Sequence, residues 1–225
     1  MQPFPEMADI LPQCAKGRAS IHHLTLDAEG GRTASYVYGE FKTPSPAGTY
    51  VTLRLSDDTG KSQVMMSDLY YERATCVEVV ERAHGDVLVA GLGIGMILHP
   101  ILRKEAVRSV TVIEKYQDVV DLVLPTLPAS EKLKVLLDDI YTWKPRRGQC
   151  YDVIWFDIWP DIEATRLPEM ARLHRRFWRY LNRANPACWM ESWHRQETRR
   201  MARQQRNAKQ RNPQSPVPVQ PEESA

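Results

Sequence analysis

The sequence predicts an α/β protein with a doubly wound, Rossmann-like, mostly parallel sheet and a small β-rich extension on its N-terminal side. Three observations support this fold class. Between residues 67 and 194, apolar runs of four to six residues alternate with helical segments, as expected for strands covered on both faces. One such run, 87–90, leads into three closely spaced glycines. The preceding region is rich in alternating β-branched and aromatic residues, which is typical of antiparallel strands.

Length and composition indicate one globular domain with appendages. The chain has 225 residues, of which 43% are hydrophobic and 26% charged. Its apolar runs fall well short of the roughly 18 residues of a membrane span. Residues 1–15 contain two acids and lack the apolar region of a signal peptide. The four cysteines are far apart and the six histidines form no metal-binding spacing. We therefore expect a cytoplasmic protein with no metal site and no membrane association.

The chain divides into four predicted segments. These are an irregular arm (1–33), a β-rich extension (34–66), the main domain (67–194) and a basic, then proline-rich and disordered tail (195–225). Within the extension, strands are expected at 35–38, 49–55 and 61–66, with a turn at 57–60. Ser67 or Asp68 is expected to cap a helix that runs to about Arg82.

The main domain is predicted to alternate strands and helices. Expected strands are 87–90, 109–113, 134–137, 151–156 and 187–193, and expected helices are 96–104, 116–124 and 168–181. Pro100 should shorten or kink the first of these helices. After residue 193 there are no apolar runs for further strands. A five-stranded sheet would then be completed by the N-terminal strands or by a second subunit in a homodimer, or it would belong to a degenerate domain.

The strongest functional pattern is a strand that enters the turn Gly91-Leu92-Gly93-Ile94-Gly95 ahead of a helix. Glycines let the backbone turn sharply and approach a ligand, with helix N–H groups facing it. The next three strands end in polar residues, namely Glu114, then Asp138 and Asp139, then Asp157 and Asp161. Open α/β sheets bind ligands at these strand ends, so we predict a ligand pocket there.

At these residues the sequence resembles the class I S-adenosylmethionine-dependent methyltransferases, over about residues 67–193. The resemblance implies that S-adenosylmethionine binds with its amino-acid end above the glycine turn. It also implies that Glu114 holds the ribose hydroxyls, that Asp139 accepts from the adenine amino group, and that Ile140 packs on the ring. The implied cofactor-binding set is Gly91, Leu92, Gly93, Gly95, Glu114, Asp139 and Ile140. A dinucleotide dehydrogenase is disfavoured, because its G-x-G-x-x-G fingerprint would need a glycine where this chain has Met96.

Within that superfamily the sequence is most similar to the spermidine synthases. Tyr70-Tyr71-Glu72 resembles their Tyr-His-Glu element, and Asp157 falls where their catalytic aspartate follows the fourth strand. The chain departs from them at Met66-Ser67, where they have Asp-Glu, and in the loop 157–161. The resemblance implies acceptor contacts from Tyr70, Tyr71, Glu72 and Trp159.

Asp157 and Asp161 are the candidate catalytic residues. Two carboxylates at a strand tip could orient or deprotonate an amine or hydroxyl nucleophile. The alternative is an aspartate that caps the following helix, beside a solvated neighbour.

Charge is distributed unevenly along the chain. Residues 165–211 contain 13 Lys and Arg against three Glu, whereas the whole chain has a net charge of +2. Arg172, Arg175, Arg176 and Arg179 recur at helical spacing, so they share a face that could follow a phosphate backbone without reading sequence. A solvated helix surface explains the same pattern.

Three functions remain open from the sequence. The first is methyl transfer from S-adenosylmethionine to an unidentified small-molecule or macromolecular acceptor. The second is aminopropyl transfer from decarboxylated S-adenosylmethionine. The third is a non-catalytic protein of the same fold that binds nucleic acid through its basic arm.

Overall fold

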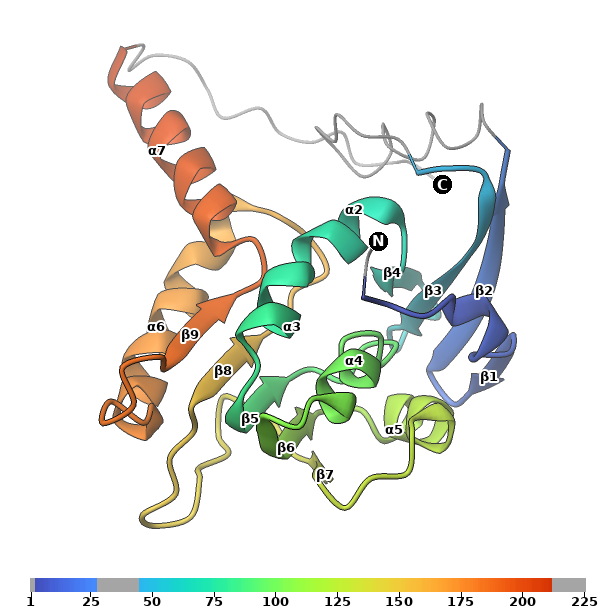
Figure 1. Cartoon of the computed structure of the whole chain (residues 1–225). Coiled ribbons are helices and arrows are strands. Elements are labelled where there is room, and N and C mark those ends of the chain that lie inside the picture. The colour runs from blue at the N-terminus through green and yellow to red at the C-terminus, as the bar shows by residue number, and fades with distance from the viewer. Residues whose placement is uncertain (1–2, 28–44, 212–225) are drawn as a thin grey trace.

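The computed structural model of the chain describes residues 3–27 and 45–211, and contains two sheets (Figure 1). The larger sheet is five-stranded and parallel, in the order β7-β6-β5-β8-β9. Its strands are β5 (Gly85–Ala90), β6 (Val107–Glu114), β7 (Leu133–Leu137), β8 (Val153–Phe156) and β9 (Trp189–Ser192). The chain therefore has the predicted doubly wound α/β fold, with the strand that precedes the glycine turn at the centre of the sheet.

The central strand β5 is buried on both faces. Val87 pairs with Val110 of β6 and Val153 of β8, and residues 87–90 are at most 1% exposed. Alternate side chains enter two different apolar clusters. One cluster contains side chains of α3, α4 and α5, and the other contains those of α6. This explains why the parallel strands are continuous apolar runs rather than alternating ones.

The helices are short, apart from the last two. They are α2 (Tyr70–Thr75), α3 (Val77–Arg82), α4 (Leu98–Arg103), α5 (Gln117–Val123), α6 (Leu167–Phe177) and α7 (Arg195–Arg211). Single 3-10 turns are η1 (Met7–Asp9), η2 (Leu124–Thr126), η3 (Ala164–Arg166) and η4 (Trp178–Tyr180). Pro100 lies in the first turn of α4, where its missing N–H leaves no helical bond unmade.

The single helix expected over 67–82 is in fact two helices that meet at Cys76. The expected cap was also wrong, because Leu69 holds the N-cap position and its own side chain makes no capping hydrogen bond. Ser67 is the last residue of β4, and its hydroxyl donates to Glu72 Oε1 at 2.8 Å. Asp68 is engaged elsewhere, since its carboxylate accepts from the backbone N–H of Val51 at 2.6 Å.

The smaller sheet is antiparallel and precedes the main domain in the sequence. It runs in the order β1 (Cys14–Lys16), β2 (Ala19–Leu26), β3 (Gly48–Ser56) and β4 (Ser62–Ser67). The irregular arm expected over 1–33 was therefore wrong for its described part, which contributes two strands to this sheet. Ala19 and Ile21 are buried at 1%, but the adjacent His22 and His23 obscure the alternation in the sequence. The strand expected at 35–38 lies outside the described residues.

A buried ion pair ties the small sheet to the start of the main domain. Arg73 of α2, 6% exposed, donates from Nη2 to Asp68 Oδ2 at 2.7 Å and from Nε to the Asp68 carbonyl at 2.8 Å. Asp68 has no exposed surface, and Arg73 Nη2 also reaches Glu6 Oε2 at 3.0 Å. Each buried charge is thus compensated, which is what makes its burial tolerable.

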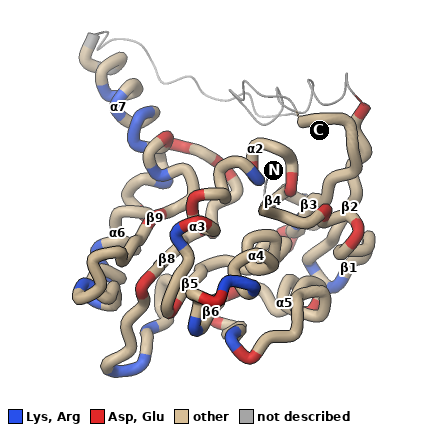
Figure 2. The backbone as a smooth tube through the Cα atoms, in the orientation of Figure 1, with Lys and Arg blue, Asp and Glu red and all other residues tan. Residues whose placement is uncertain are grey.

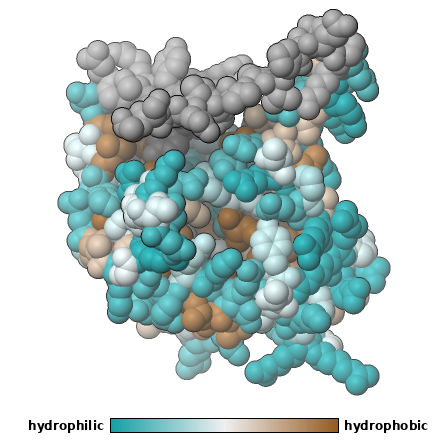
Figure 3. All heavy atoms as spheres, turned by 180° about the vertical axis from the view of Figure 1, so that it is seen from behind, coloured by the Kyte–Doolittle hydropathy of each residue, from teal (hydrophilic) through white to brown (hydrophobic). Residues whose placement is uncertain are grey.

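The basic part of the predicted tail is the helix α7, and residues 212–225 lie outside the described residues. None of the helices in the described part of the chain is long and apolar enough to cross a membrane. Seen from behind, the surface is mainly hydrophilic, with small separate hydrophobic patches (Figure 3).

Candidate functional site

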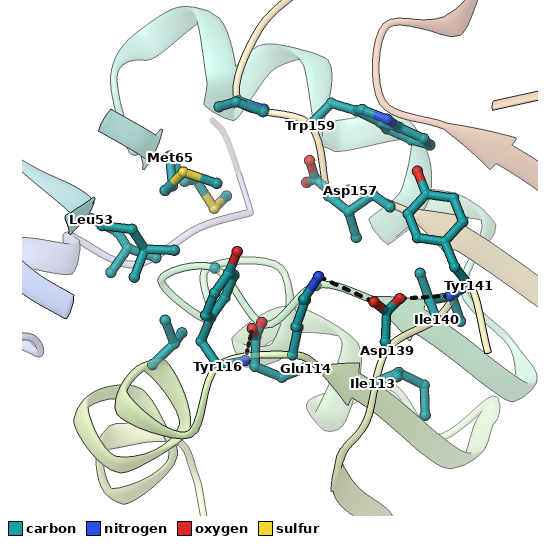
Figure 4. Close-up of a pocket in the computed structure, with 18 of the residues that line it drawn as sticks. Leu53, Met65, Ile113, Glu114, Tyr116, Asp139, Ile140, Tyr141, Asp157 and Trp159 are labelled. Carbon is teal, nitrogen blue, oxygen red and sulfur yellow. Dashed lines mark hydrogen bonds and ion pairs between the residues drawn. The ribbon is translucent and has the colours of Figure 1, made fainter. Parts of the chain in front are cut away.

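A pocket lies where the C-terminal ends of β5, β6, β7 and β8 face the antiparallel sheet. Its cavity volume is about 230 Å³, and it opens to solvent at its mouth. Its lining contains carboxylates from the parallel strand ends and apolar side chains from β3 and β4 (Figure 4). The strand ends that the sequence marked out therefore do meet in one cavity.

The glycine turn forms the floor of this pocket and leaves no room for side chains. Gly91 has φ +96°, and a Cβ there would lie 2.1 Å from the carbonyl oxygen of Asp157. Gly93 has φ +53°, and a Cβ there would lie 2.3 Å from Met66 Sδ. Both residues line the pocket, so the backbone itself faces the ligand.

The other two residues predicted in this turn do not face the pocket. Leu92 is 4% exposed and belongs to the apolar core, and it contributes through its backbone N–H. Gly95 instead packs closely against Leu127, because a Cβ on Gly95 would lie only 2.7 Å from Leu127 Cδ2. Both residues shape the turn without lining the cavity, and their contact with the cofactor stays a prediction.

Glu114 is held in a fixed orientation at the tip of β6. Its Oε2 accepts from the Leu92 N–H and its Oε1 from the Tyr116 N–H, both at 2.8 Å. The residue is 5% exposed, and burial raises the pKa of its carboxyl above the ordinary value despite these bonds. A carboxylate has about four lone-pair positions, so two remain for hydroxyl donors of a ligand.

Asp139 and Ile140 lie side by side at the end of β7. Asp139 accepts from the Tyr141 N–H at 2.8 Å and pairs with Lys115 Nζ at 3.1 Å. Burial opposes ionisation of this carboxyl, but the two contacts hold its pKa below the ordinary value. Ile140 is 4% exposed and presents an apolar surface to the pocket. The pair therefore offers a charged acceptor next to a surface on which a flat ring could pack.

An arginine of α6 fixes the loop that carries these residues. Arg176 donates from Nη1 to the carbonyl of Ile140 at 2.9 Å, and its guanidinium also reaches the carbonyls of Tyr141 and Trp143. The sequence suggested Arg176 as part of a phosphate-binding face. That interpretation was wrong for this residue, which holds the wall of the pocket.

Asp157 follows β8 and faces the pocket from the side opposite Glu114 (Figure 4). Its backbone N–H donates to the Ala90 carbonyl at 2.9 Å, which fixes it next to the glycine turn. Burial raises the pKa of its carboxyl to about 7. Such a group changes protonation state near neutral pH, as a general base requires.

Glu72 of α2 is the acidic neighbour of Asp157. Burial, with a smaller contribution from the charge of Asp157, raises the pKa of Glu72 to about 8 against two hydrogen bonds from Ser67. The sequence predicted Glu72 as an acceptor contact, and the structure brings it into electrostatic contact with Asp157 without placing it in the pocket lining.

The remaining predicted residues of this element lie away from the pocket lining. Tyr70 is 36% exposed, and its N–H donates to Ser45 Oγ. The ring of Tyr71 stacks on His194 at 5.1 Å, beside the start of α7, and burial raises the pKa of its phenol. Neither residue is brought to the cavity, because the helix that carries them starts after β4 has passed over the glycine turn.

Asp161, predicted as the second catalytic carboxylate, does not line the pocket. It forms a bidentate ion pair with Arg166, at 2.9 Å from Nε and 2.8 Å from Nη2. Trp159 does line the pocket, and its Nε1 donates to Glu169 Oε2 at 3.0 Å. Tyr141 donates to the same oxygen at 3.0 Å, so the three residues form one wall.

The opposite wall comes from residues that the sequence did not single out. Leu53 and Leu55 of β3 and Met65 and Met66 of β4 line the pocket from the antiparallel sheet. The alternating apolar pattern of these two strands indicated that one face of the antiparallel sheet is buried. Which face of the sheet would meet the glycine turn could not be read from that pattern.

Comparison with known proteins gives fold neighbours only. No family model matches the chain, and no curated protein is similar to it. N-methyltransferase NodS from Bradyrhizobium japonicum WM9 is similar over 51% of this chain and 64% of its own, with 13% identity and a TM-score of 0.40. Spermidine synthase from Thermotoga maritima is similar over 59% of this chain and 49% of its own, with 12% identity and a TM-score of 0.40.

The strand order β7-β6-β5-β8-β9 gives the chain a Rossmann-like, doubly wound parallel sheet. The chain spans less than two thirds of the length of these neighbours. At such identities and TM-scores the likeness carries no information about activity.

Proposed function

We propose that the protein is an S-adenosylmethionine-dependent methyltransferase whose acceptor loses a proton on methylation. The observation that carries this proposal is one cavity with two unlike carboxylates. Glu114 is held rigidly by two backbone N–H groups, and Asp157, across the cavity, has a pKa of about 7.

The residues present fit the cofactor. Glu114 retains lone pairs for the two ribose hydroxyls, and Asp139 with Ile140 supplies an acceptor and an apolar surface for the adenine. The amino-acid end would lie on the bare backbone of Gly91 and Gly93. When bound, S-adenosylmethionine supplies an electrophilic methyl group on its sulfonium.

The role of this chain is to orient the acceptor and accept its proton. Asp157 lies next to the glycine turn and near Trp159, across the pocket from Leu53 and Met65. At neutral pH a pKa of about 7 leaves a large fraction of the carboxylate ionised and basic enough to take a proton from an amine or hydroxyl. The nucleophile's lone pair would form the new bond to the methyl carbon as the carbon–sulfur bond breaks and leaves its electron pair on the sulfur. The nucleophile's proton would pass to the Asp157 oxygen. Proximity and exclusion of water supply the rest of the rate enhancement.

A second candidate is aminopropyl transfer from decarboxylated S-adenosylmethionine. One observation favours it. Among the described residues, two basic side chains line the pocket, and both are paired, Lys115 with Asp139 and Arg166 with Asp161. A cofactor carboxylate would then depend on backbone N–H groups alone, whereas the decarboxylated form needs no partner there.

Titration calorimetry of the purified protein with each cofactor form tests the proposal. We expect S-adenosylmethionine to bind, and binding to be lost in Gly93→Arg, whose side chain would enter the cleft after displacing the flexible Met66. Gly60→Arg is the matched control, because Gly60 also has a positive φ (+84°) but has nothing within 4 Å of its Cβ position. Preference for the decarboxylated form would favour the second candidate. Failure of both forms to bind would refute both enzymatic functions.

A further inference from the structure

The last described helix, α7, is attached to the molecule by one face. It starts directly after β9 and packs against α6 and η3, and its remaining length projects from the body (Figure 1). Thr198 is fully buried, and Met201 and Ala202 are half-buried. These three residues define the attached face of the helix.

The opposite face of α7 carries exposed arginines. Arg199, Arg200, Arg203 and Arg206 are all exposed. At 100° per residue they fall within an arc of about 120°, turned away from Thr198 and Met201. Figure 2 shows basic positions following the helix along this projection. We call these four residues the α7 arginine face.

The α7 arginine face is not used to hold the fold together. Arg195, at the base of the helix, pairs with Glu191 at 3.3 Å. Within residues 3–27 and 45–211, no carboxylate lies within ion-pair distance of the four arginines. Four like charges over about 10 Å of helix repel one another, so this face is electrostatically poised for a polyanion.

The chemistry of this face identifies the kind of polyanion. Asn207 lies among the arginines and adds a hydrogen-bond donor, whereas large apolar side chains are absent from this described arc. Amphipathic helices that enter membranes need such side chains, and protein interfaces need them as central anchors. Guanidinium groups match phosphate oxygens in bidentate geometry. We propose that the α7 arginine face binds the phosphate backbone of a nucleic acid without regard to base sequence.

The test is fluorescence anisotropy of the full chain with labelled RNA and duplex DNA of arbitrary sequence, each at several salt concentrations. Each phosphate contact contributes about 0.7 to the salt slope for single strands and about 0.9 for duplex DNA. Four contacts to a duplex should therefore lower affinity about 100-fold between about 50 and 200 mM salt. The triple variant Arg199→Gln, Arg203→Gln, Arg206→Gln keeps one contact. The same change in salt should lower its affinity only about threefold to fourfold.

The matched control removes the same charge elsewhere. Lys144, Arg146 and Arg147 are exposed in the loop between β7 and β8, and their triple change to glutamine should leave the salt slope of the wild type. Circular dichroism confirms that both triple variants are folded. The proposal is overturned if the salt slope falls equally in the two triple variants, or if the wild type does not bind nucleic acid. Binding to phosphatidylserine vesicles without binding to nucleic acid also overturns it. No readout involves the cofactor, so the result stands apart from the proposed activity.

Discussion

Replacing Asp157 with asparagine should stabilise the fold, and the gain should grow as the pH rises. The unfolded chain ionises this carboxyl near 4, whereas burial raises its pKa in the folded protein to about 7. Between these values the folded state binds the extra proton, so the stability of the wild type falls as the pH rises through this window. Asparagine does not ionise, so the stability of the variant does not fall with pH for this reason.

The magnitude follows from the size of the shift. About three pKa units at 1.36 kcal/mol each give a cost of about 4 kcal/mol at pH 8, where the folded carboxyl is ionised. At pH 5 the cost is about 1.5 kcal/mol, because only ionisation of the unfolded chain contributes. Partial exposure of the residue makes both values upper limits. The gain from Asp157→Asn should therefore increase by up to about 2.5 kcal/mol between the two pH values.

Urea unfolding at pH 5 and pH 8, followed by circular dichroism, measures this difference. A gain that is the same at both pH values, or a loss at both, would refute the raised pKa and support a capping role instead. Asp161→Asn is the control, because it breaks an ion pair with Arg166 whose side chains are 28% and 31% exposed. We expect that variant to lose about 1 kcal/mol or less.

Three further outcomes are expected. Gly91→Ala places a Cβ 2.1 Å from a backbone oxygen and should lower the free energy of unfolding by about 3 kcal/mol or more. Gly60→Ala has open space around its Cβ and should lower it by about 1 kcal/mol. Thermal unfolding of the two variants measures the difference. Arg73→Gln leaves its fully buried aspartate partner without a counter-charge and should cost about 3–5 kcal/mol in urea unfolding; a loss below about 1 kcal/mol would contradict this. Arg176→Gln removes donors to the loop at Ile140 and beyond, and should speed amide hydrogen exchange in residues 141–143 about tenfold or more; unchanged exchange would show that the loop is held by other contacts.

The parallel sheet was predictable from the sequence because its strands are nearly all apolar and end at recognisable residues. The run 87–90 and the glycines after it placed the central strand, and Glu114, Asp139 and Asp157 marked the ends of its neighbours. These features are local. Chain order then brings the strand ends together, since parallel strands in a doubly wound sheet end at the same edge.

The parts that could not be predicted depend on contacts between distant segments. The strand Ala19–Leu26 was missed because its inward residues are separated by polar ones, including two histidines, and only pairing with β3 orders it. The position of Asp161 after β8 resembled that of a catalytic residue. Its carboxylate instead forms an ion pair with Arg166, five residues later. Arg176 looked like a surface cation, and its role appears only when α6 packs against the loop after β7.

The contact between Gly91 and Asp157 has a mechanical consequence. The two backbones lie side by side with no side chain between them, at a spacing that would not admit even a methyl group. A hydrogen bond from Asp157 N–H to Ala90 ties the same two strands one residue earlier. The turn and the acid therefore cannot move independently. A ligand that displaces the turn by a fraction of an ångström must displace the acid with it, so the two halves of the pocket are aligned as one rigid part.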